Sequence, residues 1–209
     1  VVSGDTRFDR VAENAKNKIK LKEIEAFCGS QKVLVAGSTW PADEALLNSI
    51  IENYTDWKFI IAPHEIAETN LKQLEKQLFG KTIRYSNLQG AKLTLPQVLI
   101  IDNIGLLSSL YSFGHVAYIG GGFGKGIHNT LEAAAFGLPV IFGPNYQKFQ
   151  EAKDLIELKA GFSISNQAEL NDCFNLLQAG THKEAGKQAK AYVDSQKGAT
   201  TQILKKILA

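Results

Sequence analysis

The chain has 209 residues, and 23 lysines and arginines against 21 aspartates and glutamates give a formal net charge of +2. Its 44% hydrophobic and 21% charged residues are typical of a globular protein and exclude disorder, collagen-like sequence and a disulfide scaffold. The balanced charge favours a small molecule or a protein as partner over nucleic acid. Cys28 and Cys173 lie far apart without metal-ligand spacing, which is typical of buried thiols in a reducing compartment.

The sequence lacks membrane-spanning and signal segments, and it also lacks methionine. No run approaches the ~18 consecutive apolar residues that cross a bilayer, and no signal peptide is recognisable. The sequence contains no methionine and begins at Val1. We therefore expect a soluble piece of a longer protein.

The first thirty residues differ from those that follow. Thr6 and Asp9 have the spacing of a capping box. Apolar residues follow at helical spacing, namely Phe8, Val11, Ala15 and Ile19. This pattern predicts a lead helix, and we expect residues 1–30 to be a linker from an upstream domain and residues 31–209 to form one domain.

Short runs rich in β-branched or aromatic residues then alternate with segments of helical periodicity. The runs predict strands at residues 32–36, 57–62, 82–85, 97–101, 115–120, 139–142 and 161–164. The helical segments lie at residues 41–54, 65–79, 105–113, 129–136, 148–159 and 167–178. A last helical stretch at 183–208, broken near Gly198, closes the chain.

This alternation predicts an α/β fold, a Rossmann-like doubly wound parallel sheet with helices on both faces. Ligands of such sheets bind at the carboxyl ends of the strands, near the point where the strand order reverses. The loops that we expect to carry function are therefore 37–41, 63–65, 102–106, 120–129 and 143–149.

The most informative of these loops has five glycines within residues 120–126, directly after a predicted strand. Glycines before a helix N-terminus are typical of a phosphate site. The candidate phosphate loop consists of Gly121, Gly122, Gly124 and Lys125. Its spacing fits neither the dinucleotide fingerprint nor the P-loop, which needs Ser or Thr where Gly126 stands. The alternative is a flexible loop that binds no ligand.

Asn129 and Glu132 lie three residues apart at the start of the next predicted helix. A carboxylate there can accept from both hydroxyls of a ribose, and the alternative is that the pair caps the helix. His128 and Glu132 could ligate a metal, but no third ligand is near in the sequence. Asp102 ends a predicted strand, where an aspartate more often binds the next turn than acts as a base.

A second helix start lies after the first predicted strand. Ser38 and Thr39 precede Pro41, with Asp43 and Glu44 in the following turn. These residue types favour helix capping by Ser38 or Thr39 over contact with a ligand.

Several of these segments together resemble a known family. Residues 126–144 read GIHNTLEAAAFGLPVIFGP, which is similar to the donor-site signature of the 3-deoxy-D-manno-octulosonic acid (Kdo) transferases. Residues 4–9 (GDTRFD) resemble the family's interdomain segment, and residues 36–40 (AGSTW) resemble the loop after the first strand of its second domain. Residues 148–149 match the family's Lys-Phe. The likeness covers most of residues 4–152 in the right order.

The resemblance implies that the chain is the C-terminal, donor-binding half of a GT-B glycosyltransferase. Such an enzyme transfers Kdo from CMP-Kdo to a lipid A precursor in lipopolysaccharide biosynthesis, without a metal or other cofactor. The catalytic glutamate, the acceptor site and the membrane anchor belong to the N-terminal domain, so the resemblance implies no catalytic residue and no transfer activity in this chain. It places the parent enzyme on the cytoplasmic side of the bacterial inner membrane.

Carried over residue by residue, the family's cytidylate site falls on nine positions of this chain. They are Pro63, His64, Ile104, Gly105, Leu106, Asn129, Thr130, Leu131 and Glu132. This sequence departs from the family at His64, where arginine is common, and at Leu106, where glutamate is common. An imidazole replaces a permanently charged guanidinium at the first position, and Lys125 is a candidate to supply the positive charge. At Leu106, any contact with the nucleotide must come from the backbone.

Two other functions remain open from the sequence. One is a UDP-sugar transferase or epimerase that shares the GT-B scaffold. The other is a non-catalytic nucleotide- or partner-binding module, in which the loops at the strand ends would not converge on a ligand-sized pocket.

Overall fold

The computed structural model describes residues 3–17, 19–78, 82–88 and 96–208. Within these residues the strands form a parallel sheet in the order β3-β4-β2-β1-β5-β6-β7. Their bounds are β1 (Lys32–Thr39), β2 (Trp57–Pro63), β3 (Thr82–Arg84), β4 (Val98–Ile100), β5 (Val116–Ile119), β6 (Val140–Phe142) and β7 (Gly161–Ser163). All the predicted strands and the predicted fold class are confirmed.

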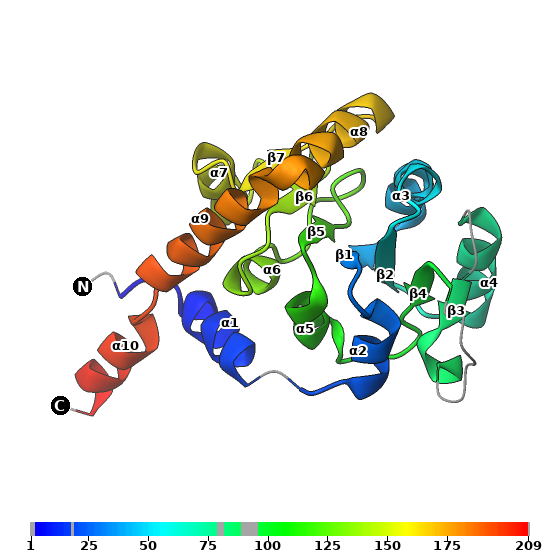
Figure 1. Cartoon of the computed structure of the whole chain (residues 1–209). Helices are drawn as coiled ribbons and strands as arrows, with labels where there is room; N and C mark the ends of the chain where they lie inside the picture. The colour runs from blue at the N-terminus through cyan, green and yellow to red at the C-terminus, as the bar shows by residue number, and fades with distance from the viewer. Residues whose placement is uncertain (1–2, 18, 79–81, 89–95, 209) are drawn as a thin grey trace.

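Helices cover both faces of this sheet (Figure 1). Their bounds are α1 (Thr6–Lys16), α2 (Lys22–Cys28), α3 (Pro41–Asn53), α4 (Glu68–Gln77), α5 (Leu107–Leu110), α6 (Leu131–Ala135), α7 (Gln150–Glu157), α8 (Gln167–Leu176), α9 (His182–Ser195) and α10 (Ala199–Ile207). One face packs against α1, α2, α5 and α6, and the other against α3, α4 and α8. No helix of the described residues combines the length and the apolar character that a bilayer span requires.

The central strands are apolar because both of their sides are covered. Every residue of β4 and β5 is buried. Alternate side chains enter opposite clusters, so Leu99 packs on the face of α1 and α2 while Val98 and Ile100 pack on the face of α3 and α4. This is the pattern that a parallel sheet between two helical layers requires.

The capping box predicted for the lead helix is wrong. The capping residue is Asp5, whose carboxylate accepts from the Arg7 amide at 2.8 Å, because α1 already begins at Thr6. Asp9 instead turns away from the helix and accepts from the amides of Gly198 at 2.7 Å and Thr200 at 2.8 Å. The helical face also ends earlier than predicted, since α1 stops at Lys16 and the side chain of Ile19 is 54% exposed.

The two ends of the chain meet on one side of the molecule. α1 packs against α6, α9 and α10, so the first helix lies beside the last two (Figure 1). The predicted break near Gly198 is confirmed, because α9 ends at Ser195 and α10 begins at Ala199. The role of residues 1–30 as a linker from another domain stays a prediction.

Candidate functional site

The strand order reverses between β1 and β5, which lie side by side at the centre of the sheet. At their carboxyl ends the Gly120 amide donates to the Gly37 carbonyl at 2.9 Å. A Cβ at Gly120 would lie 2.2 Å from the backbone oxygen of Ser38, so only glycine allows the two strand ends to approach this closely. The glycine-rich loop therefore begins against the loop that follows β1.

The predicted capping of α3 by Ser38 or Thr39 is wrong. The capping position is Trp40, whose amide donates to the Asp43 carboxylate at 2.9 Å. The Thr39 hydroxyl instead donates to the buried Glu44 carboxylate at 2.9 Å. Burial raises the pKa of Glu44. The helix begins at Pro41, one residue later than a cap at Thr39 would require and two later than a cap at Ser38 would require.

Asp43 connects this helix start to the glycine-rich loop. Its side chain is 1% exposed and accepts from the Gly121 amide at 3.0 Å and from the Tyr118 hydroxyl at 2.9 Å. Within the loop, the Gly124 and Gly126 amides both donate to the Gly121 carbonyl. Several amides of the loop are thus already bonded to protein acceptors, which leaves fewer of them to cradle a phosphate than the sequence predicts.

The candidate phosphate loop borders a cavity of about 500 Å³. Gly121 and Gly122 are buried, whereas Gly124 and Lys125 are exposed. The lining residues are Trp40, Pro41, Ala42, Asp43, Gly121, Phe123, Gly124, Lys125, Gly126 and His128. The first turn of α3 and the glycine-rich loop therefore both line this cavity.

A second cavity, of about 120 Å³, lies at the carboxyl ends of β1 and β5, beside α5. Its lining residues are Gly37, Ser38, Leu107, Tyr111, Ile119, His128, Asn129 and Glu132. His128 borders both this cavity and the larger one. The ends of β1 and β5, the helical segment that follows β4 and the start of α6 thus meet at one pocket, while residues 102–106 do not line it. The ligand site at these loops stays a prediction.

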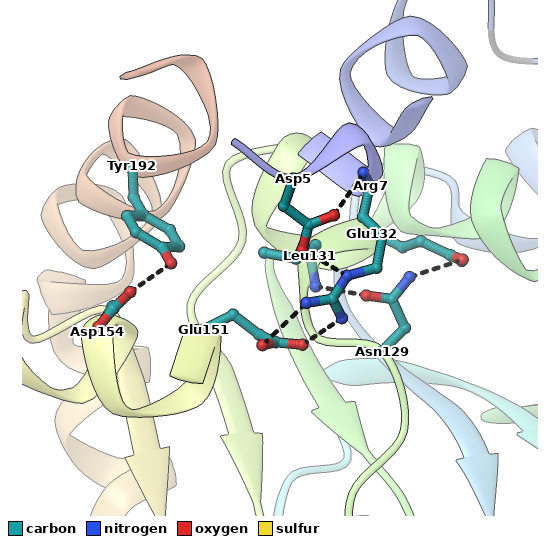
Figure 2. A network of polar contacts seen from close by, with 8 residues as sticks. All are labelled: Asp5, Arg7, Asn129, Leu131, Glu132, Glu151, Asp154 and Tyr192. Carbon is teal, nitrogen blue, oxygen red and sulfur yellow. Dashed lines mark hydrogen bonds and ion pairs between the residues drawn. The ribbon is translucent and has the colours of Figure 1, made fainter. Parts of the chain in front are cut away.

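Asn129 and Glu132, predicted to bind the nucleotide, are joined to one another in this smaller cavity. The Asn129 amide group donates to the Glu132 carboxylate at 3.1 Å, and its oxygen accepts from the Leu131 amide at 3.0 Å (Figure 2). Asn129 therefore does bond the start of α6, as the capping alternative predicts. The Glu132 carboxylate also lines the cavity and retains acceptor capacity for a ligand.

The other predicted cytidylate contacts lie in different surroundings, some buried and some exposed. Thr130 and Leu131 are both fully buried and do not line the cavity. The Thr130 hydroxyl has no hydrogen-bond partner in the described structure. Ile104 is 88% exposed in the loop after β4, followed by Gly105 with φ of +94°. Leu106 packs against the core, and its neighbour Leu107 lines the cavity instead.

His64 lies at the site, but within an aromatic cluster that the sequence does not predict. Its exposed ring stacks on Trp40 and on His128, with centroids 4.6 Å apart in both pairs. The Trp40 indole N–H donates to Nε2 of His128 at 3.2 Å. Burial and the neighbouring His64 lower the pKa of His128, which favours the neutral ring that accepts this bond. Pro63 ends β2 and lines a separate hollow beside Trp40.

Tyr111 is a site residue that the sequence reasoning missed. It follows α5 and is 2% exposed, and its ring lines the cavity with Glu132. Leu107 and Tyr111 stand four residues apart after a predicted strand, so helical spacing places both on one face. That spacing was a usable signal, but it did not say that the face turns toward the cavity.

Polar contacts also link the starts of α1 and α7 (Figure 2). The Arg7 guanidinium donates to both carboxylate oxygens of Glu151, at 2.8 and 3.4 Å, and to the carboxylate of Asp5 at 2.8 Å. Asp102, considered as a base, accepts from the backbone and hydroxyl of Ser86. These carboxylates are therefore engaged with protein donors.

Comparison with known proteins places this geometry in context. No family model matches the chain. The 3-deoxy-D-manno-octulosonic acid transferase of Aquifex aeolicus (strain VF5) is 33% identical over 144 residues, which cover 66% of this chain and 39% of that protein. The Rickettsia prowazekii (strain Madrid E) transferase of the same name is 30% identical over 175 residues, covering 78% and 37%. This chain therefore spans under half the length of these relatives.

The structural likeness agrees with the sequence likeness. The C-terminal CMP-Kdo binding domain of WaaA from Acinetobacter baumannii superposes with a TM-score of 0.68 at 22% identity, covering 89% of this chain and 97% of that one. The chain is a homologue of the Kdo transferases. Its sheet and helices are those of one half of the GT-B fold. A UDP-N-acetylglucosamine 2-epimerase shares that fold more distantly, with a TM-score of 0.57 at 14% identity and 45% of its chain covered.

Within the Kdo transferase family's donor signature, the structure thus joins Asn129 to Glu132 and brings His128 against His64. In the described residues, no group of three His, Cys, Asp or Glu side chains is arranged to hold a metal ion. Cys28 and Cys173 are free, and burial raises the pKa of both thiols to about 12.

Proposed function

We propose that this chain is the donor-binding domain of a glycosyltransferase that transfers Kdo from CMP-Kdo to a lipid A precursor. The observation that carries the proposal is the cavity at the carboxyl ends of β1 and β5, beside α5, which Asn129 and Glu132 line. The likeness to the Kdo transferases supports the choice of donor.

The nucleoside end of the donor occupies this smaller cavity in our proposal. The Glu132 carboxylate is an acceptor on the cavity wall, held in place by the Asn129 amide group. Ribose offers two neighbouring hydroxyl donors to such a carboxylate. The cytidylate contacts of Pro63, His64, Ile104, Gly105, Leu106, Thr130 and Leu131 remain part of the proposal, those of Thr130 and Leu131 through their backbone.

The phosphate lies toward the larger cavity, because His128 borders both cavities and the glycine-rich loop continues from there. As the glycosidic bond breaks, the cytidylate leaves and its phosphate gains negative charge. Lys125, exposed on the loop, can stabilise that charge together with backbone donors. The proposed transfer therefore needs no metal or other cofactor.

The acceptor and the general base belong to another part of the enzyme in this proposal, as does any contact with the inner membrane. A base must reach the acceptor hydroxyl to take its proton, within hydrogen-bond distance. We expect the 209 residues to bind CMP and to transfer no Kdo. Transfer by the purified chain would contradict this placement of the base.

Calorimetry with CMP and UDP tests the proposal. We expect the chain to bind CMP more tightly than UDP, and Glu132→Ala to weaken CMP binding about 10-fold or more because a charged acceptor is lost. Glu157→Ala, on the exposed part of α7, is the matched control and should leave binding unchanged. No heat of binding up to about 10 mM CMP would reject the proposal, and a preference for UDP would favour a UDP-sugar enzyme instead.

A further inference from the structure

Tyr111 is a buried residue that lines the smaller cavity. Tyr111 is 2% exposed, and it lines this cavity with Ser38, Asn129 and Glu132. The hydroxyl of a largely buried tyrosine usually has a hydrogen-bond partner, in the protein or in a ligand or water beside it. No hydrogen bond joins the Tyr111 hydroxyl to the part of the chain that the structure describes, so this donor lacks a protein acceptor.

The space for this hydroxyl exists because residue 37 is a glycine. A Cβ at Gly37 would lie 2.2 Å from the Tyr111 hydroxyl oxygen and 2.9 Å from a methyl carbon of Leu107. Gly37 is in β1 and lines the same cavity. The phenol hydroxyl thus lies against the backbone of Gly37, beside the cavity that both residues line.

The electrostatic surroundings keep the phenol protonated. Burial raises the pKa of Tyr111, and the negative charge of Glu132 raises it further. Tyr111 is therefore a hydrogen-bond donor at neutral pH, while Glu132 on the same cavity wall is an acceptor. A ligand group that serves both must accept one hydrogen bond and donate another. A hydroxyl does this, whereas a phosphate oxygen would face the carboxylate with like charge.

We propose that Tyr111 binds the ribose of the nucleotide, donating from its hydroxyl to a ribose hydroxyl that in turn donates to Glu132. This inference rests on the proposed function and adds a binding residue from the segment after β4. Gly37 contributes by leaving the room that the phenol occupies.

The test compares wild type with Tyr111→Phe by calorimetry, using CMP and its 2′-deoxy and 3′-deoxy analogues. Phenylalanine keeps the ring and removes the hydroxyl. We expect the Kd for CMP to rise about 3- to 10-fold, the range of a single hydrogen bond. For the analogue that lacks the contacted hydroxyl, the Kd of Tyr111→Phe divided by the Kd of wild type should be about one. The thermal midpoint should not decrease, since no protein hydrogen bond is lost.

Two further variants complete the design. Tyr54→Phe removes a phenol that bonds Asn175 outside the cavity, and it should leave the Kd for CMP unchanged. Gly37→Ala should weaken CMP binding by displacing the Tyr111 hydroxyl. Equal affinity of wild type and Tyr111→Phe for CMP would overturn this inference while leaving the proposed function standing. A loss that persists with both deoxy analogues would also overturn it. Absence of CMP binding in wild type would overturn both.

Discussion

The buried Asp43 carboxylate accepts a hydrogen bond from the Gly121 amide at 3.0 Å, across 78 positions of the sequence. The same side chain bonds the Trp40 amide at the start of α3 and the Tyr118 hydroxyl of β5. One side chain therefore connects the helix start, the central strand and the glycine-rich loop. The shape of that loop depends on Asp43 as well as on its own glycines.

Replacing Asp43 by asparagine should destabilise the fold. Asparagine offers one acceptor oxygen in place of two and adds an N–H₂ group where donors already point, so at least one buried donor is left without a partner. We expect the free energy of unfolding to fall by about 2–3 kcal/mol, measured by urea denaturation. Asp172→Asn, on the exposed side of α8, is the matched control. An unchanged unfolding midpoint for Asp43→Asn would contradict this account of the loop.

Asp9 should stabilise the last helix although it lies in the first. Gly198 is the capping position of α10, and its amide and that of Thr200 both donate to Asp9. Asp9→Ala removes acceptors from the first turn of α10, and we expect a loss of about 1 kcal/mol, as for a capping residue. Hydrogen exchange should become faster in α10, and the neighbouring exposed variant Glu13→Ala should leave it unchanged. Unchanged exchange in Asp9→Ala would contradict the prediction.

Lowering the pH should destabilise the protein between about pH 7 and pH 5. Nδ1 of His115 accepts from the Val33 amide and Nε2 of His128 accepts from Trp40, so both rings are held neutral. Burial lowers the pKa of both rings from the ordinary 6.5. The unfolded chain thus binds more protons in this range than the folded chain.

The contribution of the two rings to stability is fully present above pH 6.5 and is lost as the pH falls below it. Urea midpoints at pH 7.5, 6.5 and 5.5 measure the effect, and His115→Asn should reduce the slope. The lowered pKa values of Asp5 and Asp9 place their titration below this window. Burial raises the pKa of Glu44, which acts in the opposite direction, so the measurement is repeated in Glu44→Gln. A midpoint that stays constant from pH 7.5 to 5.5 in that variant would show that neither ring is held neutral.

Arg7 and Glu151 should be coupled energetically. Glu151 is 5% exposed and is paired with Arg7 through two contacts, although the Arg7 side chain itself is 47% exposed. Solvent around Arg7 weakens the pair, so we expect a coupling energy of about 1 kcal/mol in a double-mutant cycle of Arg7→Ala and Glu151→Ala. The matched cycle on Lys197 and Asp194, a more exposed pair, should give a smaller value. Additive single effects for Arg7 and Glu151 would refute the coupling.

Local patterns were sufficient to predict most of the architecture. The strands and their alternation with helices follow from apolar runs such as Val98-Leu99-Ile100, because burial on both faces requires an apolar side chain at each position. The break at Gly198 follows from backbone conformation at a single residue. The position of Asn129 and Glu132 at one helix start follows from their spacing and placed them in a shared pocket.

Local patterns failed where the partner is distant along the chain. Thr6 and Asp9 have the spacing of a capping box, yet Asp9 bonds Gly198 and Thr200 at the other end of the sequence. Ser38 and Thr39 are ordinary capping residues, yet the helix start is bonded by Asp43. Capping by these nearby residues was physically reasonable. In the folded chain the helix starts are instead bonded by other residues, and some of these partners are distant in the sequence.

The sequence by itself therefore determined the doubly wound sheet, the helices around it and the loop that carries the family's donor signature, because each depends on neighbouring residues. Only the tertiary structure decided that Asp43 bonds the glycine-rich loop, that His64 stacks on His128 and that the Tyr111 hydroxyl lies against Gly37 beside a cavity. These contacts depend on the packing of strands and helices that are far apart in the chain. Packing of that kind is set by the whole core, and no single motif encodes it.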